Sequence, residues 1–232
     1  MTGESVGLVA GAGRSESAAW CEPSSVQPGG RVRAPGELAL VQAFINSHYD
    51  LEFQHGADLF ATPAAFTRWI ARRSPPGAGD AGTDISSGDV RRAVAVREGL
   101  RALARINNGP EPAARRALEE LNAAAIGVAI EVVFTEDGPR FVPGGRTVLE
   151  QALGVVLAAA AGAMIDGSWR RLKVCPGEHC GWAFYDHSRN QSGRWCSMSV
   201  CGGRAKARAH YRRTRGGKRP RGGDNVRRRG GD

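Results

Sequence analysis

Four of the five cysteines of this 232-residue chain lie within 27 residues, and no other feature limits its fold so strongly. Cys175 and Cys180 form a first pair, Cys196 and Cys201 form a second, and 15 residues separate the two pairs. Each pair can form a knuckle, a tight turn that directs two thiolates to one point. Four thiolates complete the tetrahedral shell that zinc prefers. The spacing therefore predicts one zinc ion bound by Cys175, Cys180, Cys196 and Cys201.

A redox function is the alternative for these cysteines. That function favours a single C-x-x-C pair beside a βαβ pattern, which this sequence lacks. A catalytic zinc keeps one position open for water, whereas four thiolates close the shell. The surrounding segment has few large apolar residues, so metal binding would supply much of its folding free energy. We therefore expect a structural zinc, with His179, His187 and His210 outside the ligand set.

The net charge of +9 is concentrated at the C-terminal end. Residues 1–169 hold 15 Lys or Arg and 19 Asp or Glu, a net charge of −4, and residues 170–232 hold 17 and 4, a net charge of +13. Such a distribution favours a polyanionic partner for the C-terminal end. A basic tail that only increases solubility is the alternative.

The residues before the cysteines predict a mainly helical domain. Apolar residues recur at steps of three and four, the period of an amphipathic helix, and capping residues mark the starts. Four helices are expected here, one from about Glu37, one from Thr62-Pro63, one capped by Asp89 and ending near Ile106, and one from Glu111 to Asn122.

The apolar pattern changes to alternation after residue 127. Val128, Ile130 and Val132 alternate with other residues, and Asp137-Gly138 is a turn signal, so we expect one β-hairpin. Val148 to Ile165 is expected to be the longest helix and the centre of the core. The predicted fold is mainly α with one β-hairpin, followed by a small zinc-finger domain that ends in a helix starting near Gly203.

These patterns divide the chain into four parts. We expect a disordered leader (1–35), a helical domain (36–167), a zinc finger (168–213) and a basic disordered tail (214–232). The helical domain holds most of the large apolar residues, so we expect Glu37 to Ile165 to fold without the finger.

Several classes of protein are disfavoured by what the sequence lacks. No apolar run reaches the ~18 residues of a membrane span, and the N-terminus does not resemble a secretory signal, so we expect a cytoplasmic protein without membrane contact. Residues 37–165 contain no nucleophile elbow, phosphate-binding glycine loop or histidine pair at ligand spacing. An enzyme is therefore the less favoured alternative.

Residues 170–213 resemble the CGNR-type zinc finger of bacterial, chiefly actinobacterial, proteins. The matching residues are Leu172-Lys173, Cys180-Gly181-Trp182, Phe184-Tyr185-Asp186, Ser188-Arg189-Asn190, Trp195-Cys196-Ser197-Met198, Cys201-Gly202 and Arg204-Ala205-Lys206. Residues 37–166 are similar to the ABATE domain that usually precedes this finger, through Asn46, Leu59, Thr62-Pro63 and Trp69. The resemblance implies a stress-induced transcriptional regulator that binds DNA through the finger.

Two positions depart from the CGNR pattern. Gly203 stands where that family has asparagine, and Gly193 stands where a basic residue is usual. Neither departure removes a predicted metal ligand.

A positively charged helix is predicted directly after the last cysteine. A helix from Gly203 places Arg204, Arg208 and Arg212 on one row, with Lys206 and Arg213 on the opposite side. Arg189 and Arg194, between the knuckles, extend the same surface. These seven residues are the candidate nucleic-acid contacts, and duplex DNA at the nucleoid is the expected partner. A homodimer and a small-molecule ligand of the helical domain are further partners that we consider.

RNA binding is the main alternative function. Trp182, Phe184, Tyr185 and Trp195 lie near the knuckles, where aromatic rings stack on unpaired bases in other proteins. The same rings can instead form the small core around the metal, and we favour this interpretation for Trp182 and Phe184.

Overall fold

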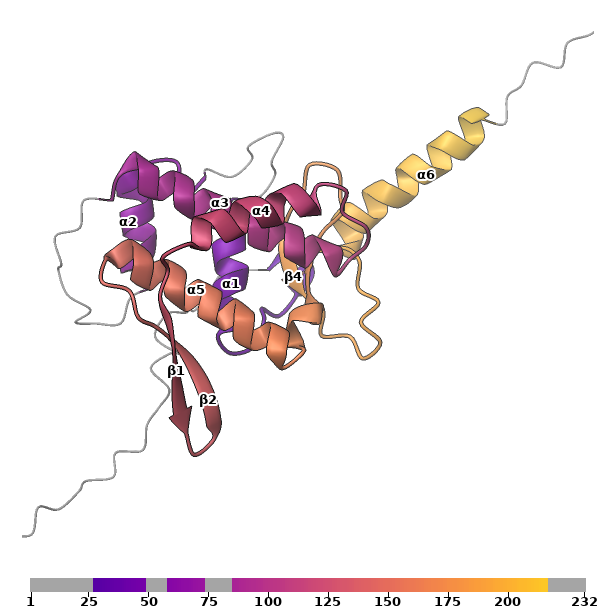
Figure 1. Cartoon of the computed structure of the whole chain (residues 1–232). Helices are drawn as coiled ribbons and strands as arrows, with labels where there is room; N and C mark the ends of the chain where they lie inside the picture. Colours follow the sequence, from indigo (N-terminus) through magenta and orange to yellow (C-terminus); the bar gives the residue numbers. More distant parts are fainter. Residues whose placement is uncertain (1–26, 49–57, 74–84, 217–232) are drawn as a thin grey trace, which may run out of the picture.

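The computed structural model describes residues 27–48, 58–73 and 85–216, and five α-helices form most of its body (Figure 1). They are α1 (Leu38–Ile45), α2 (Pro63–Ala71), α3 (Ser87–Ile106), α4 (Ala114–Ala125) and α5 (Val148–Ile165). Between α4 and α5, β1 (Ile130–Thr135) and β2 (Gly138–Pro143) form an antiparallel hairpin. The predicted fold class is confirmed.

The C-terminal part is built from short elements and one longer helix. A 3-10 turn (Ser168–Arg171) leads into the antiparallel pair β3 (Leu172–Val174) and β4 (Ala183–Tyr185). A π-helical turn (Met198–Gly202) then continues directly into α6 (Gly203–Gly216), which extends away from the body (Figure 1).

Side-chain caps fix the starts of three helices. Thr62 accepts a hydrogen bond from the amide of Ala65, as its position before Pro63 predicts. The cap of α3 is Ser86, and Asp89 at the third helical position completes a capping box, so the prediction that Asp89 is the cap was wrong. Thr147 and Glu150 form the same box at α5. With 20 residues, α3 is also longer than the 18-residue α5, contrary to expectation.

One core fills the body. Phe44, Phe60, Phe66 and Trp69 form an aromatic cluster in which neighbouring ring centroids lie as close as 4.5 Å. The helix α5 packs against α1, α3 and β2, and Leu153 and Val156 on it are almost fully buried. By length and composition α5 is apolar enough to cross a membrane, but half of it is buried inside the protein, as in the core helices of soluble proteins.

This core crosses the domain boundary that we expected at residue 168. Trp169, Leu172, Val174, Ala183 and Tyr185 are buried in the same cluster as the helices of the body. These are residues of the predicted finger. The finger therefore shares its apolar core with the body.

Hydrogen bonds from side-chain amides join the two parts as well. The carbonyl of Ala183 accepts hydrogen bonds from Gln42 (3.1 Å) and Asn46 (2.8 Å). Gln42 lies on α1, and Asn46 caps the C-terminal end of that helix. At the end of α3, Asn107 donates to the carbonyl of Leu172 and Asn108 to the carbonyl of Val174, each at 2.8 Å. These bonds attach β3 and β4 to two helices of the body.

A buried charge network lies under the same junction. Arg97 and Arg101 of α3 are each 2% exposed, and Glu98 bonds both guanidinium groups at 2.8 Å. Arg97 also forms a bidentate pair with Asp58, and Arg101 donates to the carbonyl of Gly181. Burial by itself would raise the pKa of Glu98, but the two arginine charges lower it. Arg101 thus connects α3 to the residue that follows Cys180.

Residues 27–36 lie against the finger, although residues 1–35 were predicted to be a disordered leader. Arg31 donates to the carbonyls of Cys196 (2.9 Å) and Trp195 (2.8 Å), and its guanidinium lies 4.4 Å from the ring centroid of Phe184. Gln27 accepts from Gln42 and Trp182. We call residues 27–36 the N-terminal strap. For residues 27–35 the prediction was wrong, and residues 1–26 lie outside the described part.

Candidate metal centre

Each cysteine pair sits in a turn that the local sequence sets. Cys175 follows β3, and its amide donates to the carbonyl of Trp182 (2.9 Å), while the amide of Cys180 donates to the carbonyl of Gly177 (3.0 Å). In the second pair, the hydroxyl of Ser197 accepts from the amide of Val200 and begins the π-helical turn that contains Cys201. Both turns are therefore closed by hydrogen bonds before any metal is considered.

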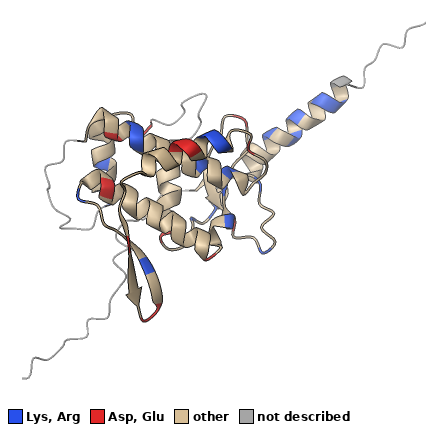
Figure 2. Cartoon of the chain, viewed as in Figure 1, with Lys and Arg blue, Asp and Glu red and all other residues tan. Residues whose placement is uncertain are grey.

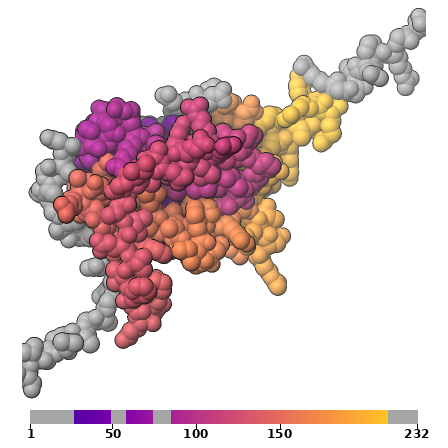
Figure 3. Space-filling view, in the orientation of Figure 1, coloured from indigo at the N-terminus to yellow at the C-terminus, as the bar shows by residue number. Residues whose placement is uncertain are grey.

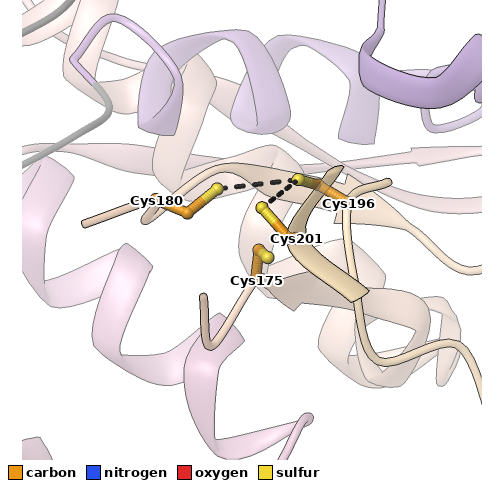
Figure 4. A group of neighbouring side chains, drawn as sticks. All are labelled: Cys175, Cys180, Cys196 and Cys201. Atoms are coloured by element: carbon orange, nitrogen blue, oxygen red, sulfur yellow. Dashed lines mark hydrogen bonds between the residues drawn. The ribbon is translucent and has the colours of Figure 1, made fainter. Parts of the chain in front are cut away.

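The four sulfurs converge on one point (Figure 4). All four Sγ atoms lie within 4.8 Å of one another, and Cys196 Sγ lies 3.6 Å from those of Cys180 and Cys201. With Zn–S bonds of about 2.3 Å, a tetrahedral site requires sulfurs about 3.8 Å apart. Cys175, Cys196 and Cys201 are buried and Cys180 is half-buried. The predicted ligand set fits one structural zinc ion.

The acidity of the thiols shows why this cluster needs a cation. Hydrogen bonds from Cys180 and Cys196 lower the pKa of Cys175 to about 2. The thiolate formed there accepts a hydrogen bond from the Cys180 thiol and raises the pKa of Cys180 to about 12, and it also raises the pKa of Cys196. Without a metal, one thiolate therefore opposes the ionisation of the others. A divalent ion at the centre offsets that repulsion and allows four thiolates.

No histidine joins this centre among the described residues. His179 follows the first knuckle, but its Nε2 lies 3.7 Å from Glu178 Oε1, and the cluster of ligand atoms consists of the cysteines alone. The shell is closed by protein ligands, so it leaves no position for a substrate. This arrangement supports a structural zinc.

A buried ion pair holds the chain between the two knuckles. Lys173 Nζ lies 2.9 Å from Asp186 Oδ2, and both side chains are at most 6% exposed. Lys173 also donates to the carbonyls of Gln191 and Gly193, while Asp186 accepts from Ser188. Burial alone would raise the pKa of Asp186, but bonds from Ser188 and Lys173 lower it to about 2. The carboxylate therefore stabilises this loop until the pH falls from 3.8 toward 2.

Comparison with known families agrees with this geometry. A family model described as "CGNR zinc finger" matches residues 171–214. The ABATE model, described as "Putative stress-induced transcription regulator", matches residues 38–167, more than half of the chain. The chain belongs to the ABATE family. No curated protein matches it.

The two departures of this ABATE protein from the CGNR pattern have different structural meaning. The amide of Gly193 donates to Asp186 Oδ2 (2.7 Å), and a Cβ at this position would lie 2.8 Å from the Asp186 carboxylate. At Gly203, a Cβ would meet only the carbonyl oxygen of Met198, at 3.7 Å. The first glycine is required by the packing of the loop, whereas the second is not.

We expect Gly193→Ala to destabilise the zinc-loaded protein by about 1–3 kcal/mol, because the new methyl group must displace a carboxylate that Lys173 holds. The matched variant Gly203→Ala should be neutral or stabilising by up to about 1 kcal/mol, because it lies at the start of a helix with free space around it. Thermal unfolding of both variants at equal zinc content measures the difference. Equal melting temperatures would contradict the assigned role of Gly193.

The structure places the seven predicted nucleic-acid contacts in two groups. Arg204, Lys206, Arg212 and Arg213 are exposed on α6, and Arg189 and Arg194 are exposed on the loop between the knuckles. Arg208 differs, because it is half-buried and its Nη1 lies 3.4 Å from Glu178 Oε2. Figure 2 shows several basic residues and no acidic residue along α6.

The aromatic residues near the knuckles are mostly inside. Phe184 is fully buried and Tyr185 is 6% exposed, so neither ring is available to stack on a base. Trp182 donates to Gln27 of the strap, and Trp195 is half-buried beside the metal cluster. Phe184, Trp182 and Trp195 form the small core around the cysteines, whereas Tyr185 packs in the core of the body. This arrangement disfavours the RNA alternative.

Three features of the site were missed by sequence reasoning. The N-terminal strap was unexpected because residues 27–36 are rich in proline and glycine and show no apolar period. The contact of Arg101 with Gly181 was unexpected because arginine on a helix is normally exposed. The bonds from Asn107 and Asn108 to the finger were unexpected because the sequence predicted only that a helix ends near Ile106.

Proposed function

We propose that this ABATE protein is a DNA-binding transcriptional regulator in which the zinc centre fixes the position of α6 for contact with duplex DNA. The observation that carries the proposal is the positive charge of α6 together with the attachment of this helix to the turn that contains Cys201. The helix holds six Lys or Arg residues and no Asp or Glu, and it begins two residues after the ligand Cys201. The family description, a stress-induced transcription regulator, supports the same assignment.

The shape of α6 suits a nucleic-acid groove. Its 14 residues give a length of about 21 Å, and an α-helix fits the major groove of B-DNA. Among residues 204–214, for which exposure is described, only Ala205, Arg208 and Ala209 are partly covered, so most of this part of the helix is open to a partner. The helix buries too little apolar area to contribute to the core, and its attachment to the zinc turn fixes its direction.

The positions of the basic residues on α6 and on the loop between the knuckles suggest separate roles in DNA binding. Arg212 and Arg213, far from the zinc turn, suit phosphate contacts, and Arg189 and Arg194 on the loop suit the neighbouring backbone. Arg204 and Lys206, near the start of the helix, suit base edges. Arg208 is held by Glu178, which reduces its availability for DNA.

Salt dependence of binding tests this assignment. In a chain that ends at Thr214, and so lacks the cations beyond it, Arg212→Ala should weaken binding to all duplexes similarly. It should reduce the slope of log K against log salt by about 0.9, the value for one lost phosphate contact. The control is Arg140→Ala, because Arg140 belongs to β2, which lies far from α6 (Figure 1), and this variant should leave the slope unchanged.

Glu178→Gln offers a second readout on the same helix. It removes the carboxylate beside Arg208, so affinity for duplex DNA should rise rather than fall. If the chain ending at Thr214 binds no duplex DNA at low salt, or if replacing Arg204, Arg208 and Arg212 together by Ala leaves binding unchanged at every salt concentration, α6 is not a DNA-binding surface.

The helical body is assigned a sensing or dimerisation role rather than catalysis. A groove between α5, β2 and residues 35–38 is the candidate place for a small ligand, and its apolar lining includes Leu38, Phe141, Ala158 and Ala163. The family description as a regulator argues against an enzyme. A DNA-binding regulator of this kind would act in the cytoplasm at the nucleoid.

A further inference from the structure

The outer edge of β1 has no role in the DNA-binding proposal. β1 pairs with β2 on one side, and no residue of the described part of the chain pairs with the other side. The amide of Gly144 donates to the carbonyl of Ala129 (2.9 Å), so residues 129 and 144 form a hydrogen-bonded pair. Because such pairs alternate along an antiparallel ladder, the backbone N–H and C=O groups of Ile130, Val132 and Phe134 point away from β2.

The outer edge of β2 is protected, in contrast to that of β1. The partners of Phe134, Val132 and Ile130 in the hairpin are Pro139, Phe141 and Pro143, and these three form the outer edge of β2. Two of the three are prolines, which have no N–H to offer to a further strand, and natural proteins use proline in this way to block edges. The outward positions of β1 contain no proline and no charge. Only one edge of this hairpin is open to strand addition.

The side chains at the open edge are apolar and exposed. Val132 is 50% and Phe134 is 83% exposed, and alternation along the strand places them on the same face as Ile130. The hairpin projects from the body, so another chain can reach this edge (Figures 1 and 3). A hairpin of two strands is marginally stable by itself, and further strands would stabilise it.

We propose that β1 pairs with β1 of a second copy of this chain, about a two-fold axis at Val132, to form a four-stranded antiparallel sheet. In this register Val132 faces Val132 of the other copy, and Ile130 faces Phe134, an aromatic and β-branched pair of the kind that stabilises sheets. Glu131 faces Val133. The strand is thus complementary to itself, as a two-fold interface requires.

Alternative registers fit less well. An axis at Glu131 would place two carboxylates directly opposite each other, which is destabilising. An axis at Ile130 or Phe134 leaves half of the strand unpaired. The register centred on Val132 uses all the outward backbone groups of Ile130, Val132 and Phe134. The proposal is independent of DNA binding, and dimerisation can be measured without DNA.

Sedimentation velocity of the full chain tests the proposal. We expect a species of twice 24.6 kDa at high protein concentration. Val132→Pro removes an N–H that the hairpin does not use, so this variant should be a monomer at the same concentration, with its zinc content and thermal transition retained. The control Pro139→Ala changes a proline on the blocked edge and should leave the dimer intact.

Cross-linking gives a second test that does not depend on how Val132→Pro folds. In a Cys21→Ser background, Val132→Cys should give a disulfide-linked dimer under mild oxidation, because Cα atoms of a hydrogen-bonded pair lie about 5.5 Å apart, within disulfide range. Val133→Cys should not, because in this register each Val133 faces Glu131 of the other copy and the two Val133 residues lie too far apart.

Three outcomes would overturn the proposal. One is a wild-type chain that stays monomeric at all concentrations. Another is a dimer that persists in Val132→Pro while Val132→Cys fails to cross-link, because the interface would then lie elsewhere. The third is a monomer that dimerises only when residues 1–26 are removed, because the open edge would then be occupied by the chain's own N-terminal segment.

Discussion

Cys196→Ser should abolish zinc binding and remove the fixed structure of both knuckles and of α6. Elemental analysis of the wild-type chain should give close to one zinc per chain, and the variant close to none. The expected effect is large, because structural zinc in small units supplies on the order of 10–16 kcal/mol of apparent folding free energy. The Sγ atom of Cys196 lies 3.6 Å from those of both Cys180 and Cys201, so its loss affects both cysteine pairs.

The loss of order should not spread evenly through the finger. Leu172, Val174, Ala183 and Tyr185 remain packed in the core of the body, whereas residues 194–213 depend on the second cysteine pair. Hydrogen exchange should therefore show loss of protection in α6 before loss in β3 and β4. Cys21→Ser, which changes the cysteine outside the cluster, is the control and should keep its zinc. Wild-type protein without zinc, or with the absorbance of an iron–sulfur cluster, would contradict the assignment.

A chain that ends at Gly167 should show no cooperative thermal transition. The truncation removes Trp169, Leu172, Val174, Ala183 and Tyr185 from the core. At about 1.5–3 kcal/mol for each large apolar side chain, the lost burial is comparable with the 5–15 kcal/mol total stability of a typical domain. It also removes the Ala183 carbonyl, which accepts from Gln42 and Asn46, and the Gly181 carbonyl, one of the acceptors of Arg101.

This expectation reverses the one drawn from the sequence, in which Glu37 to Ile165 folds alone. The matched control is a chain that ends at Thr214, which keeps every core residue and the zinc ligands and should unfold cooperatively. If the chain ending at Gly167 melts cooperatively with a heat change in proportion to its length, the body is an independent domain and the shared core is an interface between two units.

The parts of the fold that the sequence predicted are those set by local chemistry. The cysteine spacing identified all four clustered thiols, because a tetrahedral thiolate shell needs two tight turns and little else. Thr62-Pro63 located the start of α2, and Asp137-Gly138 located the hairpin. The helix cap, the hairpin turn and each cysteine pair by itself join residues no more than five positions apart, and only the meeting of the two pairs joins more distant residues.

The parts that were missed depend on contacts between distant segments. Arg97 and Arg101 are buried because Asp58, Glu98 and the carbonyls of Ile45 and Gly181 surround them, and periodicity alone places an arginine at the surface. The strap has no apolar period that would reveal it, because hydrogen bonds of Arg31 and Gln27, rather than an apolar face, hold it to the finger. The charge difference between the two parts indicated a polyanionic partner for the C-terminal end, but charge reports on the surface and does not reveal the core that the two parts share.

The N-terminal strap also bears on how the chain reaches its folded state. Arg31 and the carbonyl of Cys196 that it binds are separated by 165 positions, so this bond closes a loop spanning most of the chain. Closing such a loop costs more entropy than forming the turns of either cysteine pair, and contacts of high sequence separation slow folding. The strap should therefore dock after the helices and the zinc turns have formed. During synthesis, residues 27–36 can therefore dock only after Cys196 and Cys201, the last zinc ligands, have been made.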